Sequence, residues 1–342
     1  MSAASVGCSG AARSAQVATT PREEEPTAIA LPDLLELLPQ GVETLMVLKP
    51  DVLFSDPATR PVAELLLPPA RRDAIERRMG IRIAELTRLI VADYGEQGFI
   101  ALGAGVDRAP QVVRAIAMGM NTIETQSDAP FVRRLGYLGT QRRDVVALDA
   151  ATLLFAGEAG AHVAALLTRA RTGAWPSSAA PSAGGAQLAD LMQQLGDAPM
   201  LVVVPHHLDL PLDTGPGLLL SRQIGLAFSI APVAADALRV RVLIHGELPP
   251  GAHDNFRQWV LSVAGSPLGA IVGISEGLPT LRIQTEAESA LVSERLPTQG
   301  LVRGMSLLLA DRVGEALDVA LSGSTSSQGP PSGTGRPAPA MR

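Results

Sequence analysis

The strongest constraint on the fold is an internal similarity between two stretches of the chain that flank a low-complexity segment. That segment, residues 173–186, reads GAWPSSAAPSAGGA, and its Gly, Ser and Pro content is typical of a linker or a long loop. Each flanking half opens with an apolar run that ends at a proline, residues 45–50 in the first half and 201–205 in the second. Self-similarity of this kind indicates an architecture in which one unit is used twice.

The similarity continues beyond the opening runs. Two strand-like runs follow in each half, at residues 88–94 and 98–102 in the first and at 224–230 and 238–245 in the second. In each half, the second run is followed by a glycine and then by an amphipathic helix. Positions 143 residues apart correspond in this region: Gly103 with Gly246, Val113 with Phe256, Ile116 with Trp259, and Met120 with Val263. Because the helical register persists while the residues change, the pattern indicates duplication of a packing unit rather than of a site.

The order of the remaining elements predicts the fold class. Further strands are expected at residues 121–126, 144–155, 280–285 and 290–296, and closing helices at 159–171 and 299–320. Hairpin-like strand pairs followed by helices favour an α+β fold, with two tandem related modules of mainly antiparallel strands and helices packed on one face. The expected domains are a disordered tether (1–30), module 1 (31–172), a linker (173–186), module 2 (187–321) and a disordered tail (322–342). Whether the modules share one sheet is left open.

Composition limits the class of protein. Among the 342 residues, 46% are hydrophobic and 18% charged, so most of the chain must bury a core rather than remain disordered. The net charge is −6, and only ten residues are Phe, Trp or Tyr. A general nucleic-acid binder would be basic and would offer aromatic side chains for base stacking, so no nucleic-acid partner is expected.

The single cysteine, Cys8, excludes an intramolecular disulfide and a cysteine-based zinc site. Small residues precede it, in the order Ser5-Val6-Gly7-Cys8, and a polar Ala/Ser/Thr/Pro/Glu stretch follows it to about residue 30. This pattern resembles the end of the signal peptide in uncharacterised bacterial lipoproteins, and the resemblance covers only residues 5–10 and the tether. It implies that Cys8 is lipidated and that residues 9–30 are a flexible connection to the membrane.

Two features of this region depart from the lipoprotein pattern. Ser5 stands where the pattern prefers leucine, and seven residues before Cys8 are too few for the charged and apolar regions of a signal peptide. The resemblance therefore implies that translation starts upstream of Met1. A start at Met1 would instead indicate a cytoplasmic protein.

Candidate catalytic motifs are incomplete. Residues 273–277 match G-x-S-x-G, but a nucleophile elbow needs a histidine downstream, and none follows His253. Residues 103–105 form a partial dinucleotide-binding loop in which Arg108 takes the third glycine position, so a plain turn is favoured, with Asp107 as the helix cap. The neighbouring residues His206 and His207 would point to opposite sides of an extended segment and cannot easily share a metal ion. We therefore expect no cofactor, metal or catalytic site.

Two arginine clusters are candidates for an anionic surface. Arg71, Arg78 and Arg82 would share one helix face, and Arg133 and Arg134 lie in the second cluster together with residues 142–143. If the protein is tethered to a membrane, these guanidinium groups could pair with lipid phosphates, although a charge run is more often a solvated face. The eighteen uncharged residues 258–275 are predicted to form a helix, a turn and a second short element rather than a membrane span.

These patterns favour a non-enzymatic binding or structural protein of the bacterial cell envelope, lipid-anchored through Cys8 if translation starts upstream. Its partner would be a protein, a small molecule or, through the anchor, a membrane surface. One alternative is an enzyme with a site between the modules, built from Arg108 and its glycine loop or from His206, His207, Asp209 and Asp213. The other alternative is a cytoplasmic scaffold protein.

Overall fold

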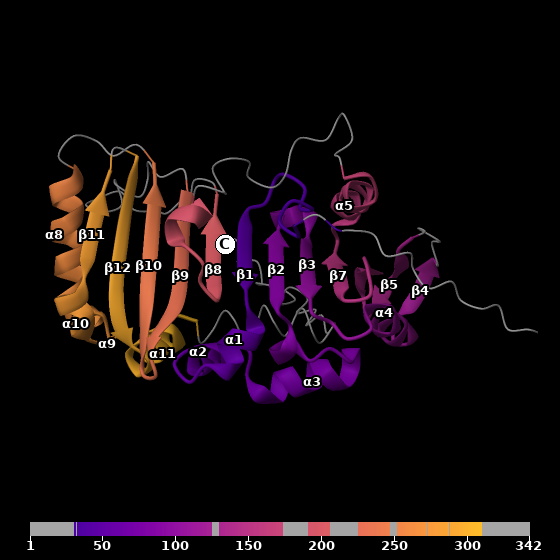
Figure 1. Cartoon of the computed structure of the whole chain (residues 1–342), viewed down its shortest axis with the longest axis horizontal. Helices are drawn as coiled ribbons and strands as arrows, with labels where there is room; N and C mark the ends of the chain where they lie inside the picture. Colours follow the sequence, from indigo (N-terminus) through magenta and orange to yellow (C-terminus); the bar gives the residue numbers. More distant parts are fainter. Residues whose placement is uncertain are drawn as a thin grey trace, which may run out of the picture.

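A single antiparallel sheet organises the chain in the computed structural model, which describes residues 31, 33–124, 130–173, 191–205, 225–246, 252–271, 273–286 and 288–309. Its strands are β1 (Thr44–Leu48), β2 (Arg88–Asp93), β3 (Phe99–Ala104), β4 (Asn121–Glu124), β5 (Val132–Leu138), β6 (Gln141–Ala147), β7 (Thr152–Gly157), β8 (Met200–Val204), β9 (Gly225–Ala234), β10 (Ala237–His245), β11 (Arg282–Thr285) and β12 (Ser289–Pro297). Their order across the sheet is β11-β12-β10-β9-β8-β1-β2-β3-β7-β6-β5-β4 (Figure 1). The fold is therefore α+β.

The two halves of the chain meet at the centre of this sheet. Strand β1 pairs with β8 in antiparallel register, with Leu45 opposite Val203 and Leu48 opposite Met200. Beside this pair, the Lys49 ammonium lies 2.5 Å from a carboxylate oxygen of Asp197. Backbone hydrogen bonding thus runs without interruption from one half into the other, which answers the question that the sequence left open.

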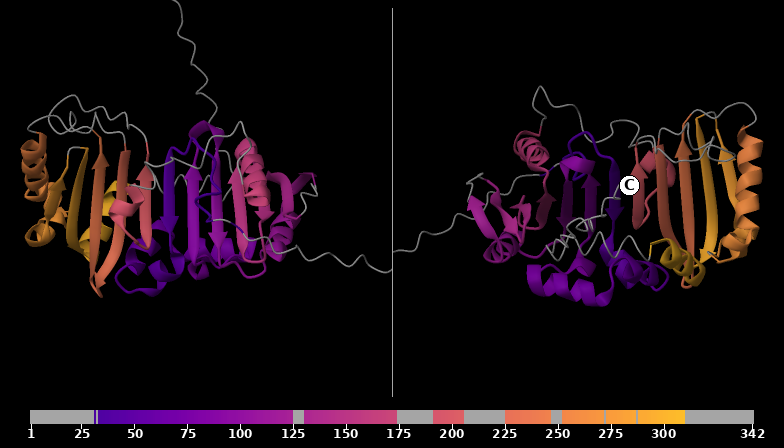
Figure 2. Two further views of the ribbon diagram at one scale, coloured as in Figure 1. Left: turned by 45° about the horizontal axis from the view of Figure 1, so that its top comes forward. Right: turned by 180° about the vertical axis from the view of Figure 1, so that it is seen from behind.

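The described helices lie at the ends and on both faces of the sheet. They are α1 (Pro50–Ser55), α2 (Arg60–Leu66), α3 (Pro69–Met79), α4 (Ala109–Met118), α5 (Gly160–Thr172), α8 (Ala252–Ala264), α9 (Pro267–Ile271), α10 (Ile274–Gly277) and α11 (Thr298–Leu309). Residues 191–195, before β8, are also helical. Figure 2 shows α1, α2 and α3 gathered at one end of the strands, and α8 at the outer end of the sheet beside β11. None of the helices described is long and apolar enough to cross a membrane.

Alternation along the strands divides the sheet into two faces. We call one the α4 face, because Leu89, Leu153 and Met200 project from it and α4 packs there. We call the other the α5 face, because the alternate residues Ile90 and Leu154 pack there with α5. Helices therefore cover both faces of the sheet. The prediction that the helices pack on one face is wrong, because α5 packs on the face opposite α4.

Three apolar clusters lie on the α4 face. The first joins α4 to strands β2, β6 and β7 through residues such as Val113 and Ile116. The second joins α1, α2 and α11 to β8, β9 and β10, and the third joins Phe256 and Trp259 of α8 to β10 and β12. Helix α4 begins where Pro110 occupies its first turn, since a proline there forfeits only an N–H that has no helical partner.

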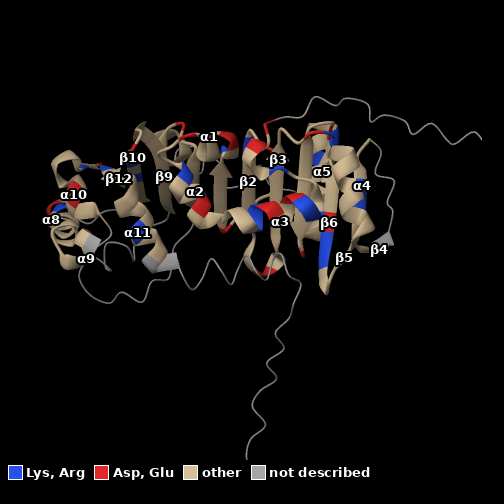
Figure 3. Cartoon of the chain, turned by 90° about the horizontal axis from the view of Figure 1, so that it is seen from below, with Lys and Arg blue, Asp and Glu red and all other residues tan. Residues whose placement is uncertain are grey.

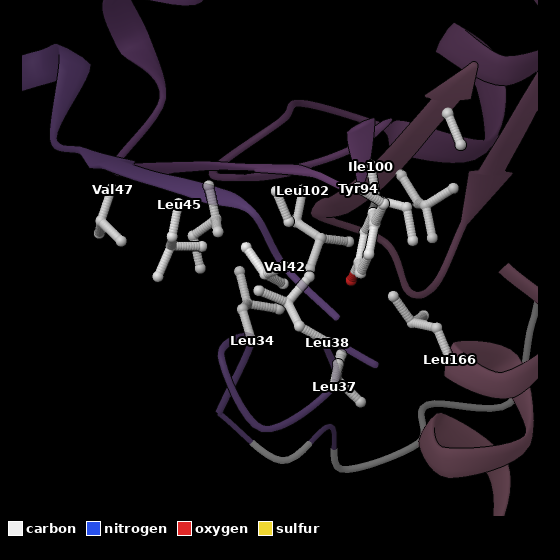
Figure 4. Packing of buried hydrophobic residues seen from close by; sticks show 14 of the residues in the cluster. Leu34, Leu37, Leu38, Val42, Leu45, Val47, Tyr94, Ile100, Leu102 and Leu166 are labelled. Atoms are coloured by element: carbon white, nitrogen blue, oxygen red, sulfur yellow. The ribbon is translucent and has the colours of Figure 1, made fainter. Parts of the chain in front are cut away.

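The largest cluster lies on the α5 face (Figure 4). Leu166 of α5 and Leu37 and Leu38 of the segment before β1 pack over Ile100 of the sheet. Tyr94 is buried among them, and its hydroxyl donates to the Pro39 carbonyl oxygen at 3.2 Å. Burial raises the pKa of the Tyr94 hydroxyl. This cluster fixes α5 over the first half of the sheet.

The elements expected from the sequence largely agree with this fold. The helices at 109–118 and 160–172 and the paired strands of both halves lie where their apolar patterns predicted them. The run at 144–155 is not one strand but the facing ends of β6 and β7, and β5 was not anticipated. The uncharged stretch 258–275 contains the end of α8, the turn at Gly265 and the short helix α9, as predicted.

Several expectations fall outside the described residues. These are the tether with Cys8, most of the linker, the C-terminal tail, and the residues His206, His207, Asp209 and Asp213. The expected division into domains likewise stays a prediction.

Candidate anion-binding site

A groove of about 550 Å³ lies on the α5 face at the outer end of the second half. We call it the arginine groove, because four arginines line it. Its lining residues are Arg239, Arg241, Pro279, Thr280, Leu281, Arg282, Gln284, Leu291, Ser293, Glu294 and Arg295. They come from strands β10, β12 and β11 and from the turn that precedes β11. A volume of this size is within the range of small-molecule sites.

Strand register brings the four arginines together. Arg239 on β10 lies directly opposite Arg295 on β12. One step along the same face, Ser293 of β12 lies between Arg241 of β10 and Arg282 of β11. Because side chains alternate along a strand, all four guanidinium groups project from the α5 face. Arginines that are up to 56 residues apart in sequence thus lie in two neighbouring rows on one surface.

This arrangement is electrostatically costly for the protein alone. Like charges directly opposite each other on antiparallel strands are destabilising. Within the described part of the chain, none of the four arginines forms an ion pair, and Arg239, Arg282 and Arg295 are exposed to solvent. Four of the eight basic residues of module 2, which also carries 14 acidic residues, gather here. The groove is therefore a positively charged site in an acidic half.

Arg241 is the most enclosed of the four and is held by the protein. Its guanidinium donates to the Leu195 carbonyl oxygen at 3.0 Å, which fixes its position against the segment before β8. Its Nε is buried and has no partner among the described residues. The protein therefore positions this side chain without satisfying all of its hydrogen-bond donors.

The outer wall of the groove is held by Thr280. Its hydroxyl donates to the Gly277 carbonyl oxygen at 2.8 Å and accepts the Arg295 backbone N–H at 2.9 Å. These bonds attach the turn before β11 to β12 beyond the last paired residue of β11. The hydroxyl of Ser293 and the amide of Gln284 remain on the lining as neutral polar groups.

The acidic residue among the described lining residues, Glu294, projects away from the arginines. It lies opposite Val240 and therefore on the α4 face, where its side chain is 7% exposed and packs against Gly277. Its Oε1 is buried without a hydrogen-bond partner among the described residues, and burial raises the pKa of the carboxyl to about 7. Near pH 7 this carboxyl is therefore ionised in only about half of the molecules.

The closing helices of the two halves pack on opposite faces of the sheet. In the first half, α5 follows β7 and packs on the α5 face through Val163 and Leu166. In the second half, α11 follows β12 but packs on the α4 face, with Leu301 and Met305 against α2. On the α5 face of the second half, the described helical residues are 191–195, and the carbonyl oxygen of Leu195 borders the groove at Arg241.

The first arginine cluster expected from the sequence does not form one helical face. Helix α3 ends at Met79, and Gly80 closes it in the left-handed conformation with φ of 70°. Arg82 lies beyond that end and pairs with Glu85 at 2.6 Å. Arg71 and Arg78 remain on α3, where acidic and basic residues are interspersed (Figure 3).

The second cluster is divided between the two faces of the sheet. Arg133 projects from the α5 face and forms an ion pair with Asp144 at 2.5 Å, and the two side chains are 11% and 5% exposed. Its neighbour Arg134 projects from the α4 face and donates to the Arg133 carbonyl oxygen. Arg143 is buried over the rings of Phe99 and Phe155. Burial lowers the pKa of its guanidinium, although Glu158 raises it.

The incomplete catalytic motifs have structural roles. Strand β3 runs antiparallel to both of its neighbours, β2 and β7. The N-cap of the following helix α4 is Arg108, with φ of 54°, and not Asp107. In the G-x-S-x-G motif, the Ser275 hydroxyl donates to the Ala264 carbonyl oxygen at 2.5 Å. His162 stacks on Tyr94 at 4.1 Å between ring centroids and bonds to Gln97. Across the described residues, no group of three His, Cys, Asp or Glu side chains could hold a metal ion.

Comparison with known proteins adds no assignment. No family model, no curated protein sequence and no solved structure gives a significant match to this chain.

Sequence reasoning did not anticipate the arginine groove. Its strand positions carry a weak signal, since Arg239 and Arg241 alternate with apolar residues and so share one strand face. Arg282 and Arg295 are distant in sequence and join them only through the register of β12.

Proposed function

We propose that this protein is a non-enzymatic binding protein of the bacterial cell envelope and that the arginine groove receives an anionic ligand. The observation that supports the proposal is the gathering of four guanidinium groups without an acidic partner among the described residues. Guanidinium pairs with phosphate and carboxylate through two parallel hydrogen bonds, which gives both attraction and orientation. A bound anion would offset the repulsion between Arg239 and Arg295.

Two parts of the site favour binding over catalysis. Among the described residues, its lining holds no histidine or cysteine, and the carboxyl that it does hold, Glu294, points to the opposite face. Such a lining offers charge and hydrogen bonds to a ligand but no paired nucleophile and base.

Calorimetric titration with inorganic phosphate at low ionic strength tests this function. We expect saturable binding of phosphate, weakened at least tenfold in the double variant Arg239→Gln/Arg295→Gln. Loss of one charge-assisted hydrogen bond costs about 1.5–3 kcal/mol, and about 1.4 kcal/mol corresponds to a factor of ten. Low ionic strength is needed because salt screens exposed charges.

A matched control comes from the same half of the chain. Arg257 on α8 and Arg303 on α11 are exposed and lie outside the groove. The double variant Arg257→Gln/Arg303→Gln removes the same charge, and its affinity should stay within a factor of two of the wild type. Equal weakening in both double variants, or no binding by the wild type, would exclude the groove as an anion site.

We propose that the envelope location depends on lipidation of Cys8, for which the Ser5-Val6-Gly7-Cys8 sequence and its polar tether are the support. Expression of the gene with its upstream DNA in a bacterium should give a membrane-bound protein that incorporates labelled palmitate. The Cys8→Ser variant should incorporate none. Unlabelled wild-type protein in the soluble fraction would contradict the anchor. Contact of Arg71 and Arg78 with lipid phosphates depends on the same anchor and stays a prediction.

We also propose that the two halves are related modules. From the centre outwards, the first half begins β1-β2-β3-β7 and the second β8-β9-β10-β12, with a helix after β3 and after β10. Those helices, α4 and α8, begin at Ala109 and Ala252, which are 143 residues apart. The groove arginines have no counterparts at that offset, where Glu96 and Gly98 stand. The support is therefore for a repeated scaffold, with the site confined to module 2.

A further inference from the structure

The arginines of the groove lie in two rows rather than in one cluster. The first row is the pair Arg239 and Arg295, and the second is Arg241, Ser293 and Arg282. Adjacent rows on one strand face are two residues apart, or roughly 7 Å. The third row, Leu243, Leu291 and Gln284, carries no charge and ends the basic surface.

We infer that the ligand presents two phosphate groups, one to each arginine row. This inference rests on the proposed anion-binding function and names its ligand class. A phosphate monoester carries about −1.5 to −2 charges at pH 7 and a diester about −1, so one group cannot balance four guanidinium groups and two groups come closer. The groove volume of about 550 Å³ also exceeds what a single phosphate needs.

The rest of the lining describes the body of this ligand. Its described residues include Pro279, Leu281 and Leu291 but no Phe, Tyr or Trp. Nucleobases are commonly held by stacking on aromatic rings, and the described part of the lining provides no such ring. The geometry therefore favours a diphosphate on a small or aliphatic body, either free in solution or displayed by a lipid headgroup.

Titration with inorganic phosphate and with pyrophosphate at equal ionic strength tests the inference. The wild type should bind pyrophosphate at least tenfold more tightly than phosphate, with one ligand per chain. In Arg239→Gln/Arg295→Gln the first row is lost, so the two affinities should converge to within about threefold. Arg282→Gln removes an arginine of the second row and should therefore reduce the preference for pyrophosphate over phosphate. Arg257→Gln/Arg303→Gln should keep this preference.

A vesicle arm separates the two sources of such a ligand. Vesicles of phosphatidylcholine that contain diphosphatidylglycerol, a lipid with two phosphates, or an equal charge of phosphatidylglycerol, a lipid with one phosphate, are sedimented with the protein. Capture that needs diphosphatidylglycerol and is competed by pyrophosphate assigns the phosphates to a headgroup, whereas a pyrophosphate preference without capture assigns them to a soluble ligand. Both outcomes support two phosphates.

The results that would contradict the two-phosphate inference differ from those that would contradict the anion site itself. Equal affinity of the wild type for phosphate and pyrophosphate overturns the two-phosphate inference but leaves the anion site standing. Absence of binding to either anion overturns both. Retention of the preference in Arg239→Gln/Arg295→Gln, whose fold is checked by circular dichroism, places the diphosphate elsewhere and also overturns the inference.

Discussion

Replacing Gly98 with alanine should lower the free energy of unfolding by about 3 kcal/mol or more, because the new methyl group meets backbone from another strand. Gly98 has φ of 90° and ψ of −159°, a conformation that is essentially restricted to glycine. A Cβ at this position would collide with the Gly157 carbonyl oxygen and would lie 2.9 Å from the Cβ of Glu158. Urea unfolding followed by circular dichroism measures the loss.

Gly80 provides the matched control for this substitution. It also has a positive φ, 70°, but no atom lies within 4 Å of a Cβ built there. The variant Gly80→Ala should therefore lower the free energy of unfolding only by the cost of placing alanine in the left-handed conformation, about 1–2 kcal/mol. Equal losses at the two glycines would contradict the close approach of β3 to the turn after β7, which positions the start of α5.

Replacing Glu294 with glutamine should raise the free energy of unfolding more at pH 8 than at pH 5. The difference between the two effects should be up to about 3 kcal/mol. Burial raises the pKa of this carboxyl from 4.5 to about 7. Between these two pKa values the folded state holds a proton that the unfolded state has released, so the stability of the wild type falls as the pH rises. Above both pKa values the carboxyl is charged in both states, and the cost of burying that charge lowers the stability by its full amount. Glutamine has no such charge, so this part of the pH dependence disappears.

The measurement is chemical unfolding of both proteins from about pH 5 to pH 8. Glu286→Gln, an exposed position on the β11–β12 connection, is the control and should leave the wild-type pH dependence unchanged. Parallel pH profiles for wild type and Glu294→Gln would show that the carboxyl is not buried as the structure places it.

The sequence predicted local elements better than their assembly. Apolar spacing was sufficient for α4, α5, α8 and the hairpins, because each depends on neighbouring residues. It could not predict which face a helix covers, and α5 and α11 follow equivalent strands yet pack on opposite faces. That choice depends on partners that are distant in sequence, such as α2.

The candidate site shows the same limit. The arginine clusters noticed in the sequence are runs of neighbours, and adjacent residues on a strand are divided between two faces, as Arg133 and Arg134 are. Charges that gather on one surface come instead from different strands. Arg282 and Arg239 are 43 residues apart in sequence, and only the registers of β11 and β10 with β12 bring them to one groove.

The most direct test of the account is the nuclear magnetic resonance spectrum of the arginine Nε–Hε groups during titration with pyrophosphate. Signals are assigned by single Arg→Gln variants at the four groove positions and at Arg257 and Arg303. The account predicts that the signals of Arg239, Arg282 and Arg295 shift together with one saturation curve, while those of Arg257 and Arg303 stay in place. Shifts spread over the exposed arginines in proportion to ionic strength, or no shift in the groove, would contradict it.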